Sequence, residues 1–303
     1  MARSGKFGSA LIYCLTRPLA ILPLSFHRKC GRLIGRIACN LLRYRRDVVM
    51  INLARCFPDK KYDELCDICR KFYAHFGKIF AEAMWFGART PEALRKSGIA
   101  RIVNVADINA CYDKGQSVFV MGSHCGNWEL FGGYRSYWED EPFKFDETNM
   151  CVVYRRLSSP AWEDFMKRNR LRPIVDKEHY DGMVESFSLV RHVLGHRDRK
   201  MFYSAVADQF PYASSRLKVD DFMHQETWSM DGAPALSHKL GMAVFFLSMR
   251  EMEDGHYEMK FIPICEDARG MSVLEILNRY YTLLEEELRA QPWNYLWTHK
   301  RWK

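Results

Sequence analysis

Short apolar runs alternate with amphipathic stretches along most of the chain, and each kind of pattern predicts a different element. Apolar runs bounded by polar or glycine-containing segments predict buried strands. Apolar residues that recur at every third or fourth position predict helices with one buried face. Strands are predicted at 99–105, 118–121, 150–154, 172–175, 201–207 and 243–248, with an antiparallel edge strand at 257–262; helices are predicted at 33–50, 61–86, 107–113, 162–169, 183–194 and 273–290, with a further helix opening near Asn127.

This order of elements predicts the fold class. Strands that alternate with helices are typical of an α/β domain with a mainly parallel sheet flanked by helices. We assign this domain to residues 61–303. Residues 1–60 are assigned to a basic, apolar, helical segment that associates with a membrane, and no repeat or low-complexity tract divides the chain further.

The distribution of charge separates residues 1–60 from the predicted α/β domain. They carry twelve Lys or Arg against two Asp, whereas the rest of the chain has a net charge of −2 within the total of +8. The longest charge-free runs here have ten residues, against roughly 20 needed to span a bilayer. Pro18 and Pro23 argue against one long helix, and no cleavage site of a signal peptide follows. An interfacial anchor with basic residues toward lipid headgroups fits best, and a helix packed on the domain itself is the alternative.

Cysteine and histidine spacing gives little sign of a metal site. The ten cysteines show no framework spacing, and Cys66 and Cys69 form a lone CxxC inside a helical pattern. His192 and His196 lie four positions apart near a predicted helix end, but the sequence offers no obvious third ligand, so cationic helix-end residues are the favoured interpretation. We expect reduced thiols facing the cytosol, and neither a metal nor a cofactor.

The run from Met121 to Glu129 carries the clearest chemical signal. It predicts a strand end, a turn loosened by glycines and the start of a helix. His124 is the only one of the ten histidines with an acidic residue five positions later, Glu129. A carboxylate on one imidazole nitrogen leaves the other free to take a proton from a hydroxyl, as acyl transfer to an alcohol requires. The alternative is a structural His124 beside a helix-capping Asn127.

The position of these residues along the predicted sheet favours the chemical interpretation. His124, Arg155 and Asp208 each fall just after a predicted strand. In open parallel sheets, ligands collect beyond the carboxyl ends of the strands. The sequence therefore predicts a site that gathers residues from several such ends.

Several short motifs, in order over most of the chain, resemble one family. The segment HCGNWE at 124–129 is similar to the HxxxxD/E motif of lysophospholipid and glycerolipid acyltransferases. The fuller pattern resembles the bacterial lipid A biosynthesis late acyltransferases of the lauroyl/myristoyl type. Two stretches depart from that pattern, 210–216 and the polar region 220–232. The other matching motifs are NL at 52–53, FPD at 57–59, VYR at 153–155, RNR at 168–170, ADQ at 207–209 and WTHKRWK at 297–303.

The resemblance implies an enzyme at the cytoplasmic face of the inner membrane. It would move a fatty acyl chain from acyl carrier protein or acyl-CoA to a hydroxyl of an anionic lipid acceptor, such as a lipid A precursor. His124 would be the general base and Glu129 its orienting partner. A thioester donor is already activated, so neither a cofactor nor a covalent intermediate on the neighbouring Cys125 is required.

Substrate binding is predicted for the polar residues around this pair. Guanidinium groups match phosphate oxygens, and a solvated basic face is their alternative role. We expect Asp208 to line the site and to pair with one of the arginines, or else to act as a cap or turn former. The predicted binding residues are Asn127, Arg155, Arg156, Arg168, Arg170 and Asp208.

Two other functions remain open at this point. One is a non-catalytic lipid-binding or membrane-binding protein that acts through the basic segment. The other is an acyltransferase acting on a lysophospholipid or an amino-acid-headed lipid. Nucleic-acid binding is disfavoured, because the basic residues are interleaved with aliphatic rather than base-stacking aromatic side chains.

Overall fold

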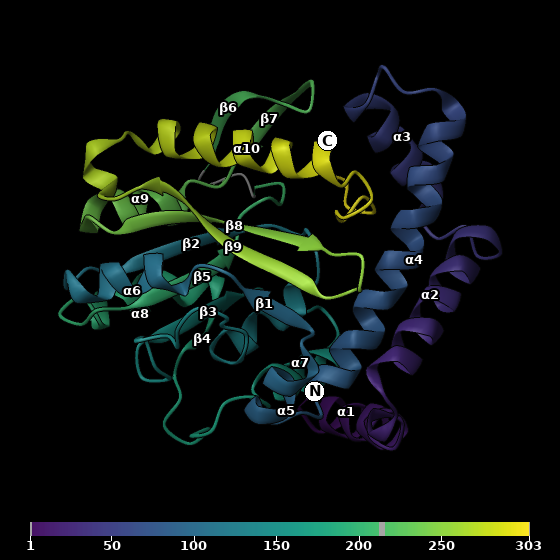
Figure 1. Ribbon diagram of the computed structural model, residues 1–303, viewed down its shortest axis with the longest axis horizontal. Coiled ribbons are helices and arrows are strands. Elements are labelled where there is room, and N and C mark those ends of the chain that lie inside the picture. Colours follow the sequence, from purple (N-terminus) through teal and green to yellow (C-terminus); the bar gives the residue numbers. More distant parts are fainter. Residues whose placement is uncertain (1, 212–215, 303) are drawn as a thin grey trace.

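A seven-stranded sheet forms the centre of the protein (Figure 1). The structure is a computed structural model and describes residues 2–211 and 216–302. The strand order is β1-β9-β8-β2-β5-β3-β4, and every neighbouring pair is parallel except β8 and β9. The predicted α/β class with a mainly parallel sheet is therefore confirmed. The strands are β1 (Ala100–Ile102), β2 (Val118–Gly122), β3 (Met150–Tyr154), β4 (Met183–Glu185), β5 (Phe202–Val206), β8 (Ala243–Glu251) and β9 (Tyr257–Cys265).

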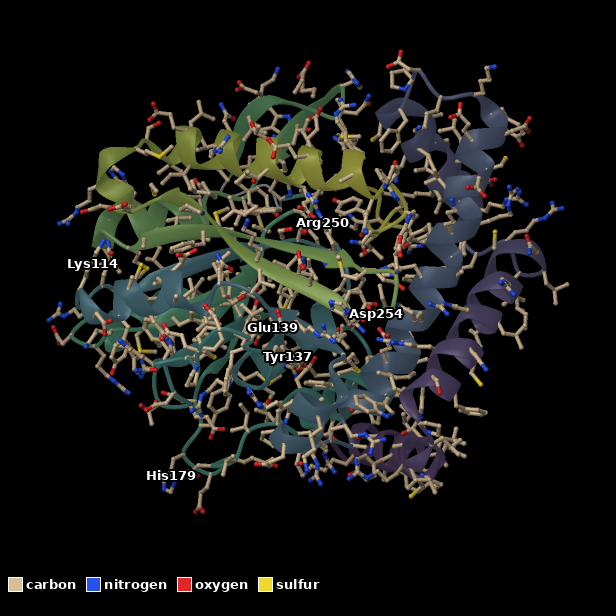
Figure 2. The ribbon with its side chains drawn as sticks, viewed as in Figure 1. Lys114, Tyr137, Glu139, His179, Arg250 and Asp254 are labelled. Carbon is tan, nitrogen blue, oxygen red and sulfur yellow. The ribbon has the colours of Figure 1, made fainter. Side chains whose placement is uncertain are left out.

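Helices cover both faces of this sheet, which explains why its central strands are apolar throughout. Phe119 and Met121 of β2 face a core shared with α8, α9 and α10, whereas Val118 and Val120 face a second core shared with α5, α6 and η2. Arg250 at the end of β8 reaches α10, where its Nη2 lies 2.8 Å from Oε1 of Glu287 (Figure 2). The covering elements are α5 (Pro91–Ser97), α6 (Val105–Asp113), η2 (Trp128–Ser136), α7 (Pro160–Arg170), η3 (Ser186–Ser188), α8 (Leu189–Gly195), α9 (Gly232–Leu240), η4 (Ala268–Gly270) and α10 (Val273–Ala290).

The amino-terminal helices pack along the side of this domain (Figure 1). Helix α1 contacts α7, and α2 lies along α4. The α2–α4 contact is so close that a Cβ on Gly35 would meet the carbonyl oxygen of Tyr73 at 1.9 Å. Among the helices of the described residues, none is long and apolar enough to cross a membrane. The elements are α1 (Ala2–Thr16), η1 (Leu19–Ile21), α2 (Leu24–Asn40), α3 (Arg46–Cys56) and α4 (Tyr62–Phe86).

Some predicted elements are wrong. The predicted helix 33–50 is broken at residues 41–45, where Arg43 and Arg45 adopt positive φ angles. Residues 172–175 form a turn instead of a strand, and the predicted helix 183–194 begins with the extended strand β4. Strand β9 is antiparallel as expected but lies inside the sheet, because β1 pairs with its outer side.

The two stretches that depart from the family pattern have different outcomes. The polar region 220–232 contributes to an antiparallel hairpin, β6 (Leu217–Phe222) and β7 (Gln225–Ser229), which packs beside α10. Of the stretch 210–216, residues 212–215 lie outside the described residues, as does Lys303 of the final motif.

Candidate active site

The turn that carries His124 begins where β2 ends, at the carboxyl edge of the parallel strands. Gly126 in this turn has a φ of +64°, a left-handed conformation that favours glycine. A Cβ at this position would lie 2.5 Å from the Met249 side chain, so space also requires glycine. The amide of Gly126 donates a hydrogen bond of 2.9 Å to Oδ1 of Asn294. Sequence and packing together therefore fix the position of this turn.

Asp208 supplies the carboxylate that contacts His124. It follows β5, the neighbour of β2, and its Oδ1 lies 2.8 Å from Nδ1 of His124. Its Oδ2 accepts a hydrogen bond of 3.2 Å from the His124 amide. Burial alone would raise the pKa of Asp208, but the charge and hydrogen bonds of His124, with a hydrogen bond from Tyr295, lower it overall. An ionised Asp208 thus holds the imidazole with Nδ1 as the donor.

This contact corrects two sequence predictions. Asp208 was expected to pair with an arginine, but its partner is His124. Glu129 was expected to hold His124, but its two oxygens accept hydrogen bonds of 2.7 and 2.8 Å from Arg170. The reason is local: residues 128–136 form a 3-10 helix, and Glu129 points from it toward the end of α7.

Arg170 is held on two sides at this position. Its guanidinium carbon lies 5.8 Å from the centre of the Tyr154 ring at the end of β3, in addition to the bidentate contact with Glu129. Burial would lower the pKa of Arg170, but Glu129 more than compensates and raises it. The guanidinium is permanently charged and only partly exposed, and its Nε and Nη2 are both bonded to Glu129.

The second nitrogen of His124 faces an amide side chain. Nε2 lies 3.1 Å from Nε2 of Gln209, and with Nδ1 as donor this Nε2 is the acceptor. The ring of Trp128 packs edge-on against the imidazole, with centroids 4.9 Å apart. Gln209 was quoted in the ADQ motif but was not predicted as a site residue. Its signal in the sequence was its place directly after Asp208.

The carboxyl-terminal segment from Asn294 to Trp297 packs behind the turn that carries His124. Asn294 accepts from Gly126 and donates to the carbonyl of Met249 at 2.8 Å. Tyr295 pairs with Cys125 in an isolated antiparallel bridge and contacts Asp208. Asn52 of α3, from the NL motif, donates to the carbonyl of Trp297 at 2.9 Å. The NL motif near the amino terminus thus holds Trp297, the first residue of the final motif, next to the segment that supports the His124 turn.

The other predicted binding residues lie in different settings. Asn127 is fully buried, and its amide donates to Oε2 of Glu82 at 3.0 Å, so it fixes the turn to α4. Arg155 and Arg156 are exposed just after β3. Arg168 is exposed and pairs with Asp164 one helical turn earlier, at 3.0 Å. Of the predicted arginines, Arg170 is the one that the structure joins to Glu129.

Cys125 does not have the environment of a nucleophile. Its side chain is buried, and burial raises the pKa of its thiol well above the usual value. A thiolate is the reactive form, and reactive cysteines lie in exposed, electropositive surroundings. The thiol next to His124 is therefore a packing group.

The arrangement has the parts of a general base. The imidazole is oriented by a buried carboxylate through one nitrogen, and its other nitrogen is directed toward a polar side chain at the sheet edge. Such a pair removes a proton from a hydroxyl and stabilises the imidazolium that forms.

Comparison with known proteins agrees with this chemistry. Residues 4–303 match the family model described as bacterial lipid A biosynthesis acyltransferase. The chain is also 22% identical over 292 residues to the lipid A biosynthesis lauroyltransferase of Escherichia coli (strain K12), covering 93% of this chain and 86% of that protein. The chain therefore belongs to the bacterial lipid A biosynthesis acyltransferase family, and it is an acyltransferase that acts on a lipid acceptor.

Proposed function

We propose that this protein transfers a fatty acyl chain from a thioester, acyl carrier protein or acyl-CoA, to a hydroxyl of a lipid A precursor. The observation that carries the proposal is the His124–Asp208 pair at the carboxyl edge of the sheet, in a chain of this family. The reaction class is O-acyl transfer, because an oriented imidazole activates a hydroxyl and the donor supplies an activated carbonyl.

In the proposed reaction, His124 moves one proton. Its Nε2 takes the proton of the acceptor hydroxyl while that oxygen attacks the thioester carbonyl. Asp208 stabilises the imidazolium through Nδ1. The new C–O bond forms, the C–S bond breaks, and the imidazolium returns the proton to the departing sulfur. The enzyme is left unchanged, without an acyl group on Cys125.

Gln209 marks where the hydroxyl would bind. The amide nitrogen of Gln209 lies 3.1 Å from Nε2 of His124. A substrate hydroxyl has to lie at a similar hydrogen-bond distance from Nε2 to give up its proton. The acceptor would displace this amide, which then becomes a neighbouring donor. Arg170, fixed by Glu129, is the proposed contact for an anionic group of the acceptor or donor. In this scheme Glu129 positions Arg170, while Asp208 orients the base.

Turnover tests this proposal directly. Purified protein is incubated with acyl donor and lipid A precursor in detergent, and free thiol and acylated lipid are measured together. We expect equal amounts of both products, and loss of both in His124→Ala. A folded His124→Ala variant with activity within tenfold of the parent contradicts the base assignment. Binding of lipid without release of thiol would favour a non-catalytic lipid-binding protein. Faster acylation of a lysophospholipid than of the lipid A precursor would identify a lysophospholipid as the acceptor.

We also propose that α1 and α2 rest on the cytoplasmic face of the inner membrane. Many large apolar side chains of these helices are exposed, and exposed Lys29, Arg32 and Arg36 lie among them on α2. Apolar side chains beside basic ones are typical of interfacial helices. The exposed apolar residues of the two helices are Phe7, Leu11, Leu15, Phe26, Leu33, Ile34 and Ile37, and those in the segments beside them are Leu19, Ile21, Leu41 and Leu42.

Matched substitutions on α2 separate the two contributions to membrane binding. Changing Leu33, Ile34 and Ile37 to Ser should weaken binding to anionic vesicles at both low and high salt. Changing Lys29 and Arg36 to Gln should weaken it at low salt only, since each basic residue contributes roughly 1 kcal/mol that salt screens. Arg32 is left unchanged because it pairs with Glu251 at 3.5 Å. Unchanged partitioning in both variants contradicts the proposed membrane surface.

A further inference from the structure

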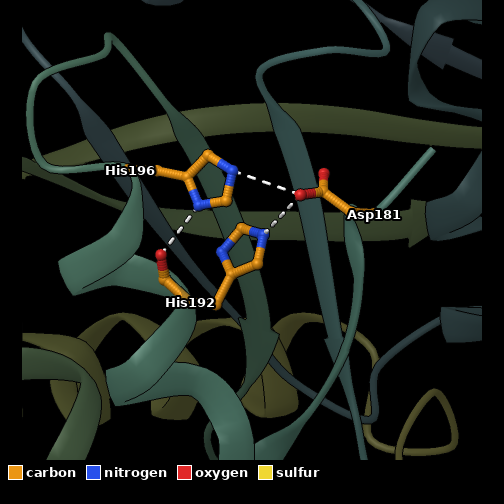
Figure 3. A group of neighbouring side chains, drawn as sticks. All are labelled: Asp181, His192 and His196. Carbon is orange, nitrogen blue, oxygen red and sulfur yellow. Dashed lines mark hydrogen bonds and ion pairs between the residues drawn. The ribbon is translucent and has the colours of Figure 1, made fainter. Parts of the chain in front are cut away.

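We propose that Asp181, His192 and His196 bind a divalent transition-metal ion, with zinc as the best match. The three side chains come from two places in the chain: Asp181 lies just before β4, and the histidines lie in and after α8. Their ligating atoms all lie within 4.8 Å of one another (Figure 3). Among the described residues, this is the one such group of three or more His, Cys, Asp or Glu side chains.

The two rings face the same carboxylate oxygen. Nε2 of His196 lies 3.1 Å from Oδ2 of Asp181, and Nε2 of His192 lies 3.8 Å from that oxygen. With metal–ligand bonds of about 2.0–2.2 Å, tetrahedral ligand atoms stand about 3.4 Å apart. The two observed distances bracket this value. The rings of His192 and His196 stack with centroids 4.2 Å apart and planes inclined by 23°, so one ring has to rotate for both Nε2 lone pairs to point at one ion.

The hydrogen bond behind His196 fixes which nitrogen faces Asp181. Nδ1 of His196 donates to the carbonyl oxygen of His192 at 2.8 Å. In the neutral ring, Nε2 then carries a lone pair that points at an acceptor oxygen. A cation between the two atoms removes this conflict. A backbone carbonyl on the far nitrogen is also the usual support of a metal-binding histidine.

His192 distinguishes a metal ion from a proton. Its side chain is 10% exposed, and neither ring nitrogen has a hydrogen-bond partner among the described residues. Leaving such a group buried and unpaired is costly. A proton on His196 would satisfy the pair with Asp181 but would leave His192 unpartnered. An ion held by both Nε2 atoms and Oδ2 satisfies the ring nitrogens that face it.

The ligand set indicates zinc. Two imidazoles and one carboxylate match the ligands of Zn²⁺, and exposed Asp181 leaves the fourth position to water. Asp181 precedes the start of β4, and the two histidines precede the start of β5. These strands are parallel to β2, and His124 follows the end of β2, so the group lies at the opposite edge of the sheet. The ion would tie the approach to β4 to the end of α8, which is a structural role.

Zinc binding to the full chain tests this proposal without any measurement of acyl transfer. Protein freed of metal with a chelator is titrated with Zn²⁺ against a chromogenic chelator, and its thermal midpoint is measured with and without Zn²⁺. We expect one equivalent to bind and the midpoint to rise, since an ion that binds only the folded state stabilises it. Co²⁺ should give a visible absorption band from the same site.

The variants are Asp181→Asn and His196→Gln, and the matched control is His179→Gln. His179 also pairs with a carboxylate, Asp176, but on an exposed outer loop (Figure 2). Zinc affinity should fall at least tenfold in both variants and stay unchanged in the control. Equal affinity of Asp181→Asn and the parent, or no binding by the parent at about 10 µM zinc, overturns the site. Each replacement is close in size to the side chain that it replaces. If one of the two variants fails to fold, the zinc affinity of the other still tests the site.

Discussion

Among the residues that the structure describes, two buried histidine–carboxylate pairs have nearly equal geometry but different surroundings. Nδ1 of His124 lies 2.8 Å from Asp208, and Nδ1 of His75 on α4 lies 2.9 Å from Glu251 at the end of β8. Nε2 of His124 contacts the side chain of Gln209. Nε2 of His75 is buried without a hydrogen-bond partner among the described residues.

The surroundings of the two carboxylates also differ. Glu251 lies 2.6 Å from the ammonium of buried Lys78, and His75 packs edge-on against Trp293 with centroids 5.1 Å apart. Burial would raise the pKa of Glu251, but His75 and Lys78 lower it to about 2. Burial lowers the pKa of His75 in spite of its carboxylate partner. A buried histidine–carboxylate pair is a candidate base only where the second imidazole nitrogen can contact a substrate. Since Nε2 of His75 is buried, the His75–Glu251 pair has a structural role.

Matched substitution of the two histidines should separate their roles most strongly. His124→Gln removes the proposed base, and we expect kcat to fall about 10²–10⁴-fold. His75→Gln keeps a hydrogen-bonding side chain near Glu251, and we expect kcat within threefold but a lower thermal midpoint. Steady-state thiol release and thermal unfolding of both variants check this. Similar losses of kcat in the two folded variants would erase the distinction.

Substitution of the two acidic residues near the site tests which one orients the base. Asp208→Asn would favour the wrong imidazole tautomer, and we expect kcat to fall about 10²–10⁴-fold. Glu129→Gln weakens the hold on Arg170, so its effect should be smaller and should raise KM for the lipid acceptor. The pH profile of kcat should change for Asp208→Asn alone. A larger fall of kcat in Glu129→Gln would return the orienting role to Glu129.

Loss of the second carboxylate should affect stability rather than turnover. Glu251→Gln breaks a buried ionic network, and we expect a loss of about 3–5 kcal/mol in the free energy of unfolding at pH 7, with kcat unchanged. Since the folded pKa lies below the usual 4.5, ionised Glu251 stabilises the protein above that pH. This contribution disappears as the pH falls toward about 2.

Denaturant unfolding at several pH values checks this dependence. The difference between the parent and Glu251→Gln should shrink as the pH is lowered from about 5 toward 2. The matched control is Glu226→Gln, since Glu226 pairs with Lys218 on the exposed hairpin and should show no measurable loss. A difference that stays constant with pH would mean that lost packing, not lost charge, causes the effect.

The smallest effect is expected at the thiol beside the proposed base. Cys125→Ala should keep kcat within about threefold, because buried Cys125 only packs behind the turn. Mass spectrometry after incubation with acyl donor alone should find no added acyl chain. An acyl group mapped to Cys125 would contradict direct transfer.

The sequence predicted regular features well, and the reason is their local periodicity. Continuous apolar runs such as 118–121 are buried on both faces, so their strand character is visible without neighbours. The importance of His124 was visible from its position after such a run. Its partner was not, because Asp208 is adjacent only through the pairing of β2 with β5.

The features that the sequence did not predict depend on the backbone conformation of a few residues. The break between α2 and α3 occurs at positive φ angles of two arginines, which residue type does not favour. Glu129 was predicted to meet His124 from the first turn of a helix, but the segment winds as a 3-10 helix and Glu129 contacts Arg170 instead. Asp181 was not associated with His192 and His196 because β4 carries the chain away from Asp181 and α8 then returns it to the same sheet edge.

The packing of Asn294 and Tyr295 behind the His124 turn has a consequence for biosynthesis. Asn294 and Tyr295 hold the turn at 125–126, and Tyr295 contacts Asp208. The sheet and the base can form from residues synthesised earlier, but the turn lacks these contacts until residues 294–295 emerge from the ribosome. A nascent chain would therefore carry His124 without its final support. Acyl transfer would begin only after residues 294–295 have been synthesised and have packed against the turn.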